Sequence, residues 1–212
     1  MKFFIHVYLI GAVSFLFCQE AFGQSKFALS ATAVPFLRHY KSRVEAILPD
    51  PNGTGTLTPQ VLESKSSSKG YWIGLNGRYS FSPKWSASTG LWYGYAGLKT
   101  AASSSRSHYF SIPLIAGFQV SESKLSPYFS AGALWNLSVT SRVRIPDFGT
   151  FNFKSDRNTS RISPTIGAGV IYNFAQRLSL IAQPTFTYDI PRHNLNIHAY
   201  QLGFNMQLML KL

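Results

Sequence analysis

Large apolar side chains recur at every second position over long stretches of this chain, and this period constrains the fold more than any other feature. Successive side chains of a β-strand point to opposite faces of the sheet. The stretch 198–212 shows the period most clearly. Its first face is continuously large, and its second face is mostly small or polar. The members of the first face are His198, Tyr200, Leu202, Phe204, Met206, Leu208, Leu210 and Leu212.

The same division into two faces is found seven more times along the chain. The segments are 27–33, 71–81, 85–95, 108–120, 129–139, 162–174 and 178–190. Together with 198–212 they predict an all-β protein of eight antiparallel strands. The first segment has the least regular period, because Val34, Pro35 and Phe36 interrupt it.

The connections alternate strictly between short and long. Short connections lie at 82–84, 121–124 and 175–177, and long ones at 38–69, 99–107, 140–160 and 191–197. Transmembrane barrels of the bacterial outer membrane have short periplasmic turns and longer extracellular loops. The sequence therefore predicts an eight-stranded antiparallel up-and-down transmembrane β-barrel, with both ends of the barrel on the periplasmic side.

Aromatic residues on the apolar faces fall near the two strand ends, with aliphatic residues between them. From Tyr71 to Tyr79 the chain covers about 27 Å along a strand, or roughly 20 Å of depth at a tilt near 40°. This arrangement predicts two girdles at the membrane interfaces. The predicted interface aromatics are Tyr71, Tyr79, Phe81, Trp85, Tyr93, Tyr95, Phe110, Phe118, Phe129, Trp135, Tyr172, Phe174, Phe186, Tyr188 and Tyr200.

The composition favours a membrane barrel over a soluble one. Charged residues make up 13% of the chain and aromatic residues 15%, whereas globular proteins are about a quarter charged. After the first eighteen residues no apolar run approaches the roughly 20 residues of a spanning helix. The alternative is a soluble lipocalin-like barrel with the apolar face inside. That face is too bulky for the interior of eight strands.

The N-terminus has the pattern of a secretory signal. A basic start at Met1-Lys2 precedes an apolar core from Phe3 to Phe17, and Ala21-Phe22-Gly23 has the small-x-small form of a cleavage site. We expect residues 1–23 to be a cleaved signal peptide and residues 24–212 to form a barrel in the bacterial outer membrane. An uncleaved membrane anchor is the alternative. Cys18 would leave with the signal, so the mature chain would contain no cysteine.

The formal net charge of +12 does not indicate nucleic-acid binding. The basic residues lie mostly between the periodic segments, and no nucleic-acid-binding motif is present. We expect the partners to be outer-membrane lipid and the phosphate groups of lipopolysaccharide, since Lys and Arg pair well with phosphate.

Several local features carry expectations of their own. Pro113 and Pro184 fall inside predicted strands, where we expect a bulge or a local widening at each. The first long loop contains a segment that could be a helix or a strand, 44–48, and a flexible stretch, 64–69. The third loop continues the alternation through Val139, Ser141, Val143 and Ile145 and resumes it at 150–153. This pattern predicts a protruding hairpin near 140–160, and an irregular loop is the alternative.

No catalytic, cofactor or metal site is predicted. The histidines outside the signal, His39, His108, His193 and His198, are scattered near the loop rim, and no mature cysteine is available as a metal ligand. Ser107 with His108, or Asp189 with His193, are conceivable parts of a hydrolase site, but no spacing defines one. In the lumen we expect a polar network of Arg78, Arg161, Asp189 and Lys211 that fills and stiffens the barrel, with a solute pore as the alternative.

Two segments resemble a known family. The stretch Tyr109-Phe110-Ser111-Ile112-Pro113-Leu114 and the stretch Ser126-Pro127-Tyr128-Phe129-Ser130-Ala131-Gly132 resemble strands of outer-membrane β-barrel proteins of Bacteroidota, including PorT-like and porin-family small barrels. Gly167-Ala168-Gly169-Val170 continues the likeness, which covers roughly 71–212. The resemblance implies an outer-membrane barrel and makes Pro113 a family feature. PorT-like members serve type IX secretion, but the resemblance does not imply a single activity.

Three functions follow from these observations. The first is a non-enzymatic barrel that acts through its extracellular loops in binding, assembly or envelope integrity, and that could be associated with secretion. The second is a narrow channel for small solutes, and the third is a lipid-modifying enzyme of the outer membrane. The hairpin near 140–160 is the expected contact for a protein partner, by strand addition.

Overall fold

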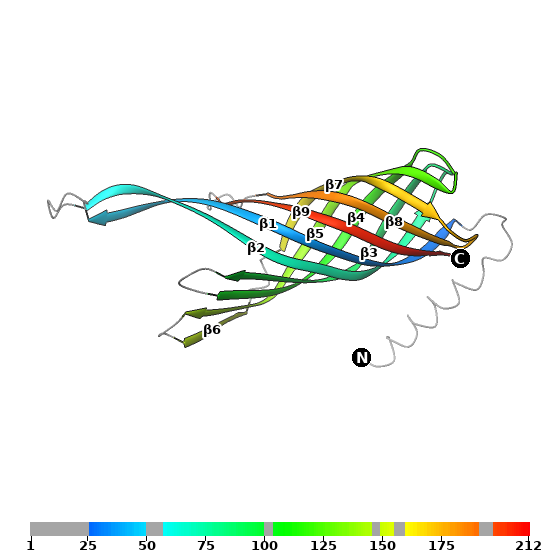
Figure 1. Cartoon of the computed structure of the whole chain (residues 1–212). Coiled ribbons are helices and arrows are strands. Elements are labelled where there is room, and N and C mark those ends of the chain that lie inside the picture. The colour runs from blue at the N-terminus through cyan, green and yellow to red at the C-terminus, as the bar shows by residue number, and fades with distance from the viewer. Residues whose placement is uncertain (1–25, 50–56, 100–103, 146–148, 155–159, 191–196) are drawn as a thin grey trace.

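The computed structural model describes residues 26–49, 57–99, 104–145, 149–154, 160–190 and 197–212. They form a closed antiparallel barrel whose strands are strongly tilted (Figure 1). The strands are β1 (Phe27–Pro49), β2 (Leu57–Ser80), β3 (Trp85–Lys99), β4 (Ser104–Gln119), β5 (Leu125–Ile145), β6 (Gly149–Lys154), β7 (Ser160–Asn173), β8 (Leu178–Asp189) and β9 (Ile197–Lys211).

Eight strands make the wall, as predicted. Their order is β4-β3-β2-β1-β9-β8-β7-β5, and a β4–β5 pairing closes the ring. The short strand β6 pairs with the outer end of β5, so it belongs to a hairpin and adds nothing to the wall. No helix in the described ranges is long and apolar enough to cross a membrane.

The two faces of the wall differ as the period of two predicts. Large apolar side chains on the outer face are exposed, with Leu75 at 70% and Ile166 at 60%. Inward side chains from the same strands are buried, as at Asn76 and Ser163. A closed barrel leaves no unpaired edge within its wall, which suits an apolar surrounding where unpaired backbone groups cost several kcal/mol each.

Prolines within the strands interrupt pairing on one side and leave the register unchanged. Opposite Pro113, the β3–β4 pairs stop at Thr89↔Leu114 and resume in step at Trp92↔Ser111. On its other side, Pro113 stays paired with Leu134. Pro184 interrupts the β7–β8 ladder in the same way. Of the bulge or local widening expected at each proline, no bulge forms, and the widening takes the form of this gap in pairing on one side, because a missing N–H affects only one neighbouring strand.

A register shift does occur, but at the outer end of β5. His108 pairs with Thr140 while Tyr109 pairs with Ser138, so Val139 is an extra residue in β5. A bulge residue reverses the alternation that follows it. The alternation that was predicted to continue from Val139 to Ile145 therefore changes phase at Val139. Arg142 and Arg144 are the exposed members beyond the bulge.

The first long connection is mostly strand. The structure continues β1 to Pro49 and begins β2 at Leu57, with unbroken pairing from Phe27↔Tyr79 to Pro49↔Leu57. The expectations of a loop at 38–69 and a flexible stretch at 64–69 are therefore wrong, and 44–48 is strand. The third loop contains the predicted hairpin, paired from Thr140↔Lys154 to Ile145↔Gly149. Both hairpins extend from the same end of the barrel (Figure 1).

Candidate functional site: lumen and outer rim

The loop end of the lumen is filled by an apolar cluster. Its members are Val34, Phe36, Trp72, Trp92, Ala96, Tyr109 and Leu134. The edge of one ring meets the face of another between Trp72 and Tyr109, with centroids 4.4 Å apart. The mostly small and polar second face of the strands predicted a lumen without such a cluster of rings. The same period of two contained the signal, since these aromatics occupy the alternate phase of their strands.

Inward glycines make room for these rings. A Cβ at Gly94 would collide with the rings of Trp72 and Tyr109, and one at Gly70 would meet the ring of Phe36. Large side chains on one strand therefore fit over glycines on the next. This complementarity lets two tryptophans and a tyrosine pack inside a ring of eight strands.

A chain of polar side chains crosses the lumen at the level of this cluster. Ser111 donates to Asn136 Oδ1 (2.9 Å), Asn136 donates to Ser163 Oγ (2.8 Å), and Ser163 donates to Asp189 Oδ1 (2.6 Å). Asp189 Oδ2 lies 3.8 Å from Arg38 Nε. The guanidinium of Arg38 in turn donates two hydrogen bonds to Gln201 Oε1, at 2.7 and 3.1 Å. These side-chain contacts connect β4, β5, β7, β8, β1 and β9, which make up most of the wall.

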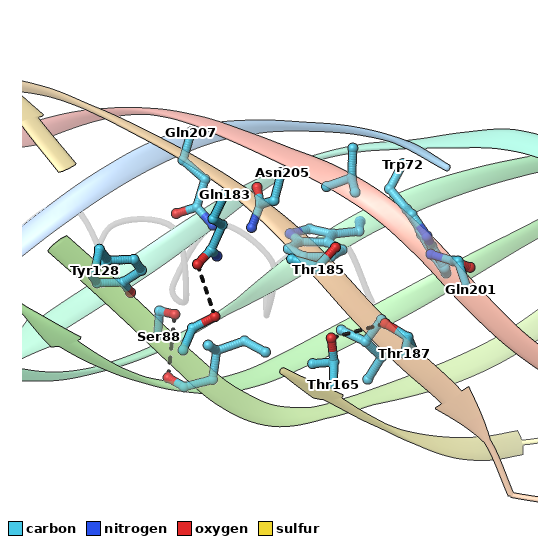
Figure 2. Close-up of a pocket in the computed structure, with 15 residues that line it drawn as sticks. Trp72, Ser88, Tyr128, Thr165, Gln183, Thr185, Thr187, Gln201, Asn205 and Gln207 are labelled. Atoms are coloured by element: carbon cyan, nitrogen blue, oxygen red, sulfur yellow. Dashed lines mark hydrogen bonds between the residues drawn. The ribbon is translucent and has the colours of Figure 1, made fainter. Parts of the chain in front are cut away.

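The middle of the lumen contains a small cavity of about 30 Å³. Figure 2 shows side chains from β8 and β9, among them Gln183, Gln201 and Asn205, converging on it with Trp72 and Tyr128. Nearby, Asn76 donates to Thr32 at 2.6 Å and accepts from Trp92 Nε1 at 2.7 Å. The cavity has room for a water or two.

A wider vestibule opens at the turn end. Its volume is about 660 Å³, and Arg78, Met209 and Lys211 are among its lining residues. Above it, Ala28, Tyr128, Ile171, Ile181 and Met209 form a second apolar cluster. The guanidinium of Arg78 lies 5.2 Å from the Tyr128 ring centroid. The second cluster separates the vestibule from the middle of the lumen.

The four predicted lumen residues do not form one network. Arg78 is buried beside Tyr128 and Met209, and Lys211 donates to Asn173 Oδ1 at 3.2 Å near the turn end. Asp189 is buried at the opposite end, and Arg161 is exposed at the outer rim. The basic residue that faces Asp189 is Arg38, which the sequence analysis had placed in a loop. Arg38 can be assigned to the inward face only when β1 is continued past Leu37.

The predicted interface aromatics lie on the outer face of the wall. Four of them, Tyr93, Tyr95, Phe118 and Tyr188, are half-buried among their neighbours, and the other eleven are exposed. At the loop end several pair with histidine across strands. Tyr93 Oη lies 2.6 Å from His108 Nδ1, and Tyr188 Oη lies 2.7 Å from His198 Nδ1. These pairs satisfy polar groups at the depth where such side chains meet both lipid tails and water.

The suggested hydrolase parts are not brought together. Ser107 contacts Ser141 at 3.2 Å, His108 contacts Tyr93, and His193 lies outside the described residues. A serine and a histidine do meet elsewhere on the rim, where Ser67 Oγ lies 2.6 Å from His39 Nδ1. No group of three or more metal-ligating side chains is found in the part of the chain that the structure describes.

A closed barrel with an apolar outer belt, aromatic girdles and a packed interior defines an integral β-barrel membrane protein. The chain belongs to the family described as outer membrane protein beta-barrel domain, whose model matches residues 51–195. This family places the protein in the bacterial outer membrane. No protein with a curated description matches the chain.

Solved structures with a similar fold have low sequence identity to the chain. Neisserial surface protein A is 18% identical with a TM-score of 0.46, over 90% of this chain and all of that one. Ail, the attachment invasion locus protein of Yersinia pestis, is 14% identical with a TM-score of 0.37, over 85% and 98%. The outer membrane protease OmpT of Escherichia coli is 8% identical with a TM-score of 0.43, over 91% and 99%.

Proposed function

We propose that this protein is a non-enzymatic outer-membrane barrel that acts through its outer hairpins, in binding, assembly or envelope integrity, including assembly linked to secretion. The length of the β1–β2 hairpin carries the proposal. Pairing with the neighbouring strands ends at Ser42↔Ile197 and at Lys69↔Gly97, yet β1 and β2 continue paired to Pro49↔Leu57. A hairpin that projects this far contributes nothing to spanning the membrane.

The backbone of both hairpins supports strand addition as the mode of partner binding. Within the described ranges, β6 pairs only with β5, and residues 57–68 of β2 pair only with β1. Each therefore presents an unpaired backbone edge, onto which an extended segment of a partner could add. The packed lumen supports action at the rim over conduction through the barrel.

Hairpin deletions in the native outer membrane test the proposal. One variant lacks residues 144–154, and a second has residues 43–63 replaced by an Asn-Gly turn, which keeps the pairing below Ser42. Heat-dependent gel mobility would verify that both variants are folded and inserted. We expect at least one to lose a protein neighbour that wild type cross-links reproducibly, or to weaken the detergent resistance of the cells. Unchanged neighbours and resistance in both folded variants would contradict the proposal.

An acyl hydrolase acting on outer-membrane lipid is the second candidate. The contact between Ser67 and His39 at the outer rim favours it, because a serine nucleophile needs a base within hydrogen-bond reach. Lipid A mass spectra from cells with wild type, with Ser67→Ala and without the gene would test this activity. Loss of an acyl chain from lipid A only in cells with wild type would establish the activity, and identical spectra in all three would exclude it.

A further inference from the structure

We propose that the outer surface of β1 to β5, just beyond the loop-end aromatics, binds the phosphate groups of lipopolysaccharide in the outer leaflet. Seven of the exposed cationic side chains that gather there form a set that we call the basic collar. They are Lys41, Arg43, Lys65, Lys69, Lys99, Arg106 and Arg144. The proposal goes beyond the proposed function, because it depends on the outer-membrane location and not on a partner at the hairpins.

The strand register places these side chains on the outer face. Lys69 pairs with Gly97, which pairs with Arg106, so all three positions share one face. Lys69 also pairs with Leu37, an exposed residue of the outer face. Beyond the bulge at Val139, even-numbered residues of β5 take the outer face, and Arg144 joins the collar for this reason.

The collar lies next to the girdle. Lys69 is two residues beyond Tyr71, and Lys41 is two residues beyond His39, which pairs with the girdle residue Tyr200. Side chains one outward position past the interfacial aromatics reach the headgroup layer of the membrane. Lipid headgroups are therefore the anions that this surface meets at closest range.

Within the residues that the structure describes, cationic side chains outnumber carboxylates on this surface. Lys41 and Lys65 are directly opposed across β1 and β2, and like charges in that position are destabilising. The ion pair found within the described residues lies inside the lumen, between Arg38 and Asp189. Glu63, opposite Arg43, is the exposed carboxylate on this part of the described surface. Anions from outside the chain would relieve the repulsion.

The arrangement around Gly97 suits a phosphate group. Lys69 and Arg106 flank this glycine on the two neighbouring strands, roughly 10 Å apart over two strand spacings. Gly97 has no side chain between them, and the hydroxyl of Tyr95 borders this space, 3.4 Å from where a Cβ of Gly97 would lie. Lys99 stands two residues further along the same strand. Arg binds phosphate through a planar fork, and Lys binds it as a mobile point charge.

The collar covers only one side of the barrel. On β7 to β9, the outward residues described at the loop end are Ser160, Ile162, Tyr188, Ile190, His198 and Tyr200. Arg161 is exposed at this rim, but it has the inward parity of the buried Ser163. A high net charge alone would not concentrate the outward cations on β1 to β5. The uneven distribution indicates a lipid-binding sector on β1 to β5.

Two charge-matched variants test the collar. The collar variant carries Lys69→Gln, Lys99→Gln, Arg106→Gln and Arg144→Gln. The control carries Lys26→Gln, Lys84→Gln, Lys124→Gln and Arg177→Gln, which removes the same charge from exposed positions at the turn end. The protein extracted from outer membranes is titrated in detergent with bisphosphorylated lipid A, and with the same lipid after removal of both phosphates.

Wild type should bind the phosphorylated lipid at least tenfold more tightly than the dephosphorylated one. The collar variant should lose at least tenfold in affinity for the phosphorylated lipid, and the control should stay within twofold of wild type, because only the collar variant loses cations that pair with the phosphate groups. Equal affinity of wild type for the two lipids would overturn the proposal, even if the collar variant failed to insert. Equal losses in both variants would also overturn it, by showing a general charge effect.

Discussion

Inside this barrel, single residues set how closely the aromatic rings can pack. Trp72, Trp92 and Tyr109 fill the loop end of the lumen because Gly74 and Gly94 leave space for them on adjacent strands. The polar chain through Arg38 and Asp189 occupies the same level. The phase of each strand is readable from the sequence. The matching of a glycine to a ring across strands depends on register, which strand patterns alone do not specify.

The glycine at position 94 should therefore be intolerant of any side chain. We expect Gly94→Ala to destabilise the barrel by about 1–3 kcal/mol, because its methyl group overpacks the rings of Trp72 and Tyr109. Gly77→Ala is the matched control, since nothing lies within 4 Å of a Cβ there. It should be neutral or slightly stabilising. Equilibrium urea unfolding in lipid vesicles measures both, and equal effects would contradict the packing account.

Arg38 should act mainly by compensating the charge of Asp189. We expect Arg38→Met to cost about 3 kcal/mol, because it leaves a buried carboxylate without its cation. Adding Asp189→Asn should recover at least half of the loss. The same unfolding assay supplies the double-mutant cycle. Additive losses in the two single variants, with no recovery, would show that the two residues do not interact.

At the scale of the strand, the period of two predicted the wall well and its outer ends poorly. Strand positions and faces agree from Tyr71 onward, because alternation within the membrane is enforced by lipid on one side and a packed lumen on the other. Beyond the girdle both faces of a strand contact water. The alternation of apolar and polar residues there no longer distinguishes a strand from a loop. The extension of β1 and β2 to Pro49 and Leu57 and the reversal at Val139 both fall in that region.

The strand prolines should be nearly neutral where they stand. In Pro113→Ala we expect a change within about 1 kcal/mol, because one regained hydrogen bond is offset by the greater freedom of the unfolded chain. Ala116→Pro, in the same strand where both neighbours pair, should cost several kcal/mol in the membrane. Unfolding of the two variants in vesicles checks the contrast. A large loss in Pro113→Ala would show that the proline stabilises the register.

At the scale of the whole molecule, two apolar clusters occupy the lumen one above the other, and a series of polar side chains crosses it at the level of the loop-end cluster. The sequence predicted a filled interior, but it attributed the filling to four charged residues at scattered levels. Those residues lie far apart along the chain. Only the closed ring shows that Arg38, from the first strand, faces Asp189, from the eighth element.

Such a lumen should not conduct. In planar bilayers we expect wild type to show no current steps above the lipid background, since the cavity in the middle of the lumen is only about 30 Å³. Insertion is verified by protease protection of the same preparation. Reproducible single-channel steps would show that the clusters open in the membrane and would favour the channel.

The central claim is that the apolar face meets lipid while the second face lines a packed interior. Its most direct test uses the four tryptophans of the chain, of which Trp85 and Trp135 face outward and Trp72 and Trp92 face inward. Four single-tryptophan variants, with the others changed to Phe, are reconstituted in vesicles of lipid with brominated acyl chains. Fluorescence of Trp85 and Trp135 should be strongly quenched, and that of Trp72 and Trp92 should not. Quenching of the inward pair, or of none, would contradict the account.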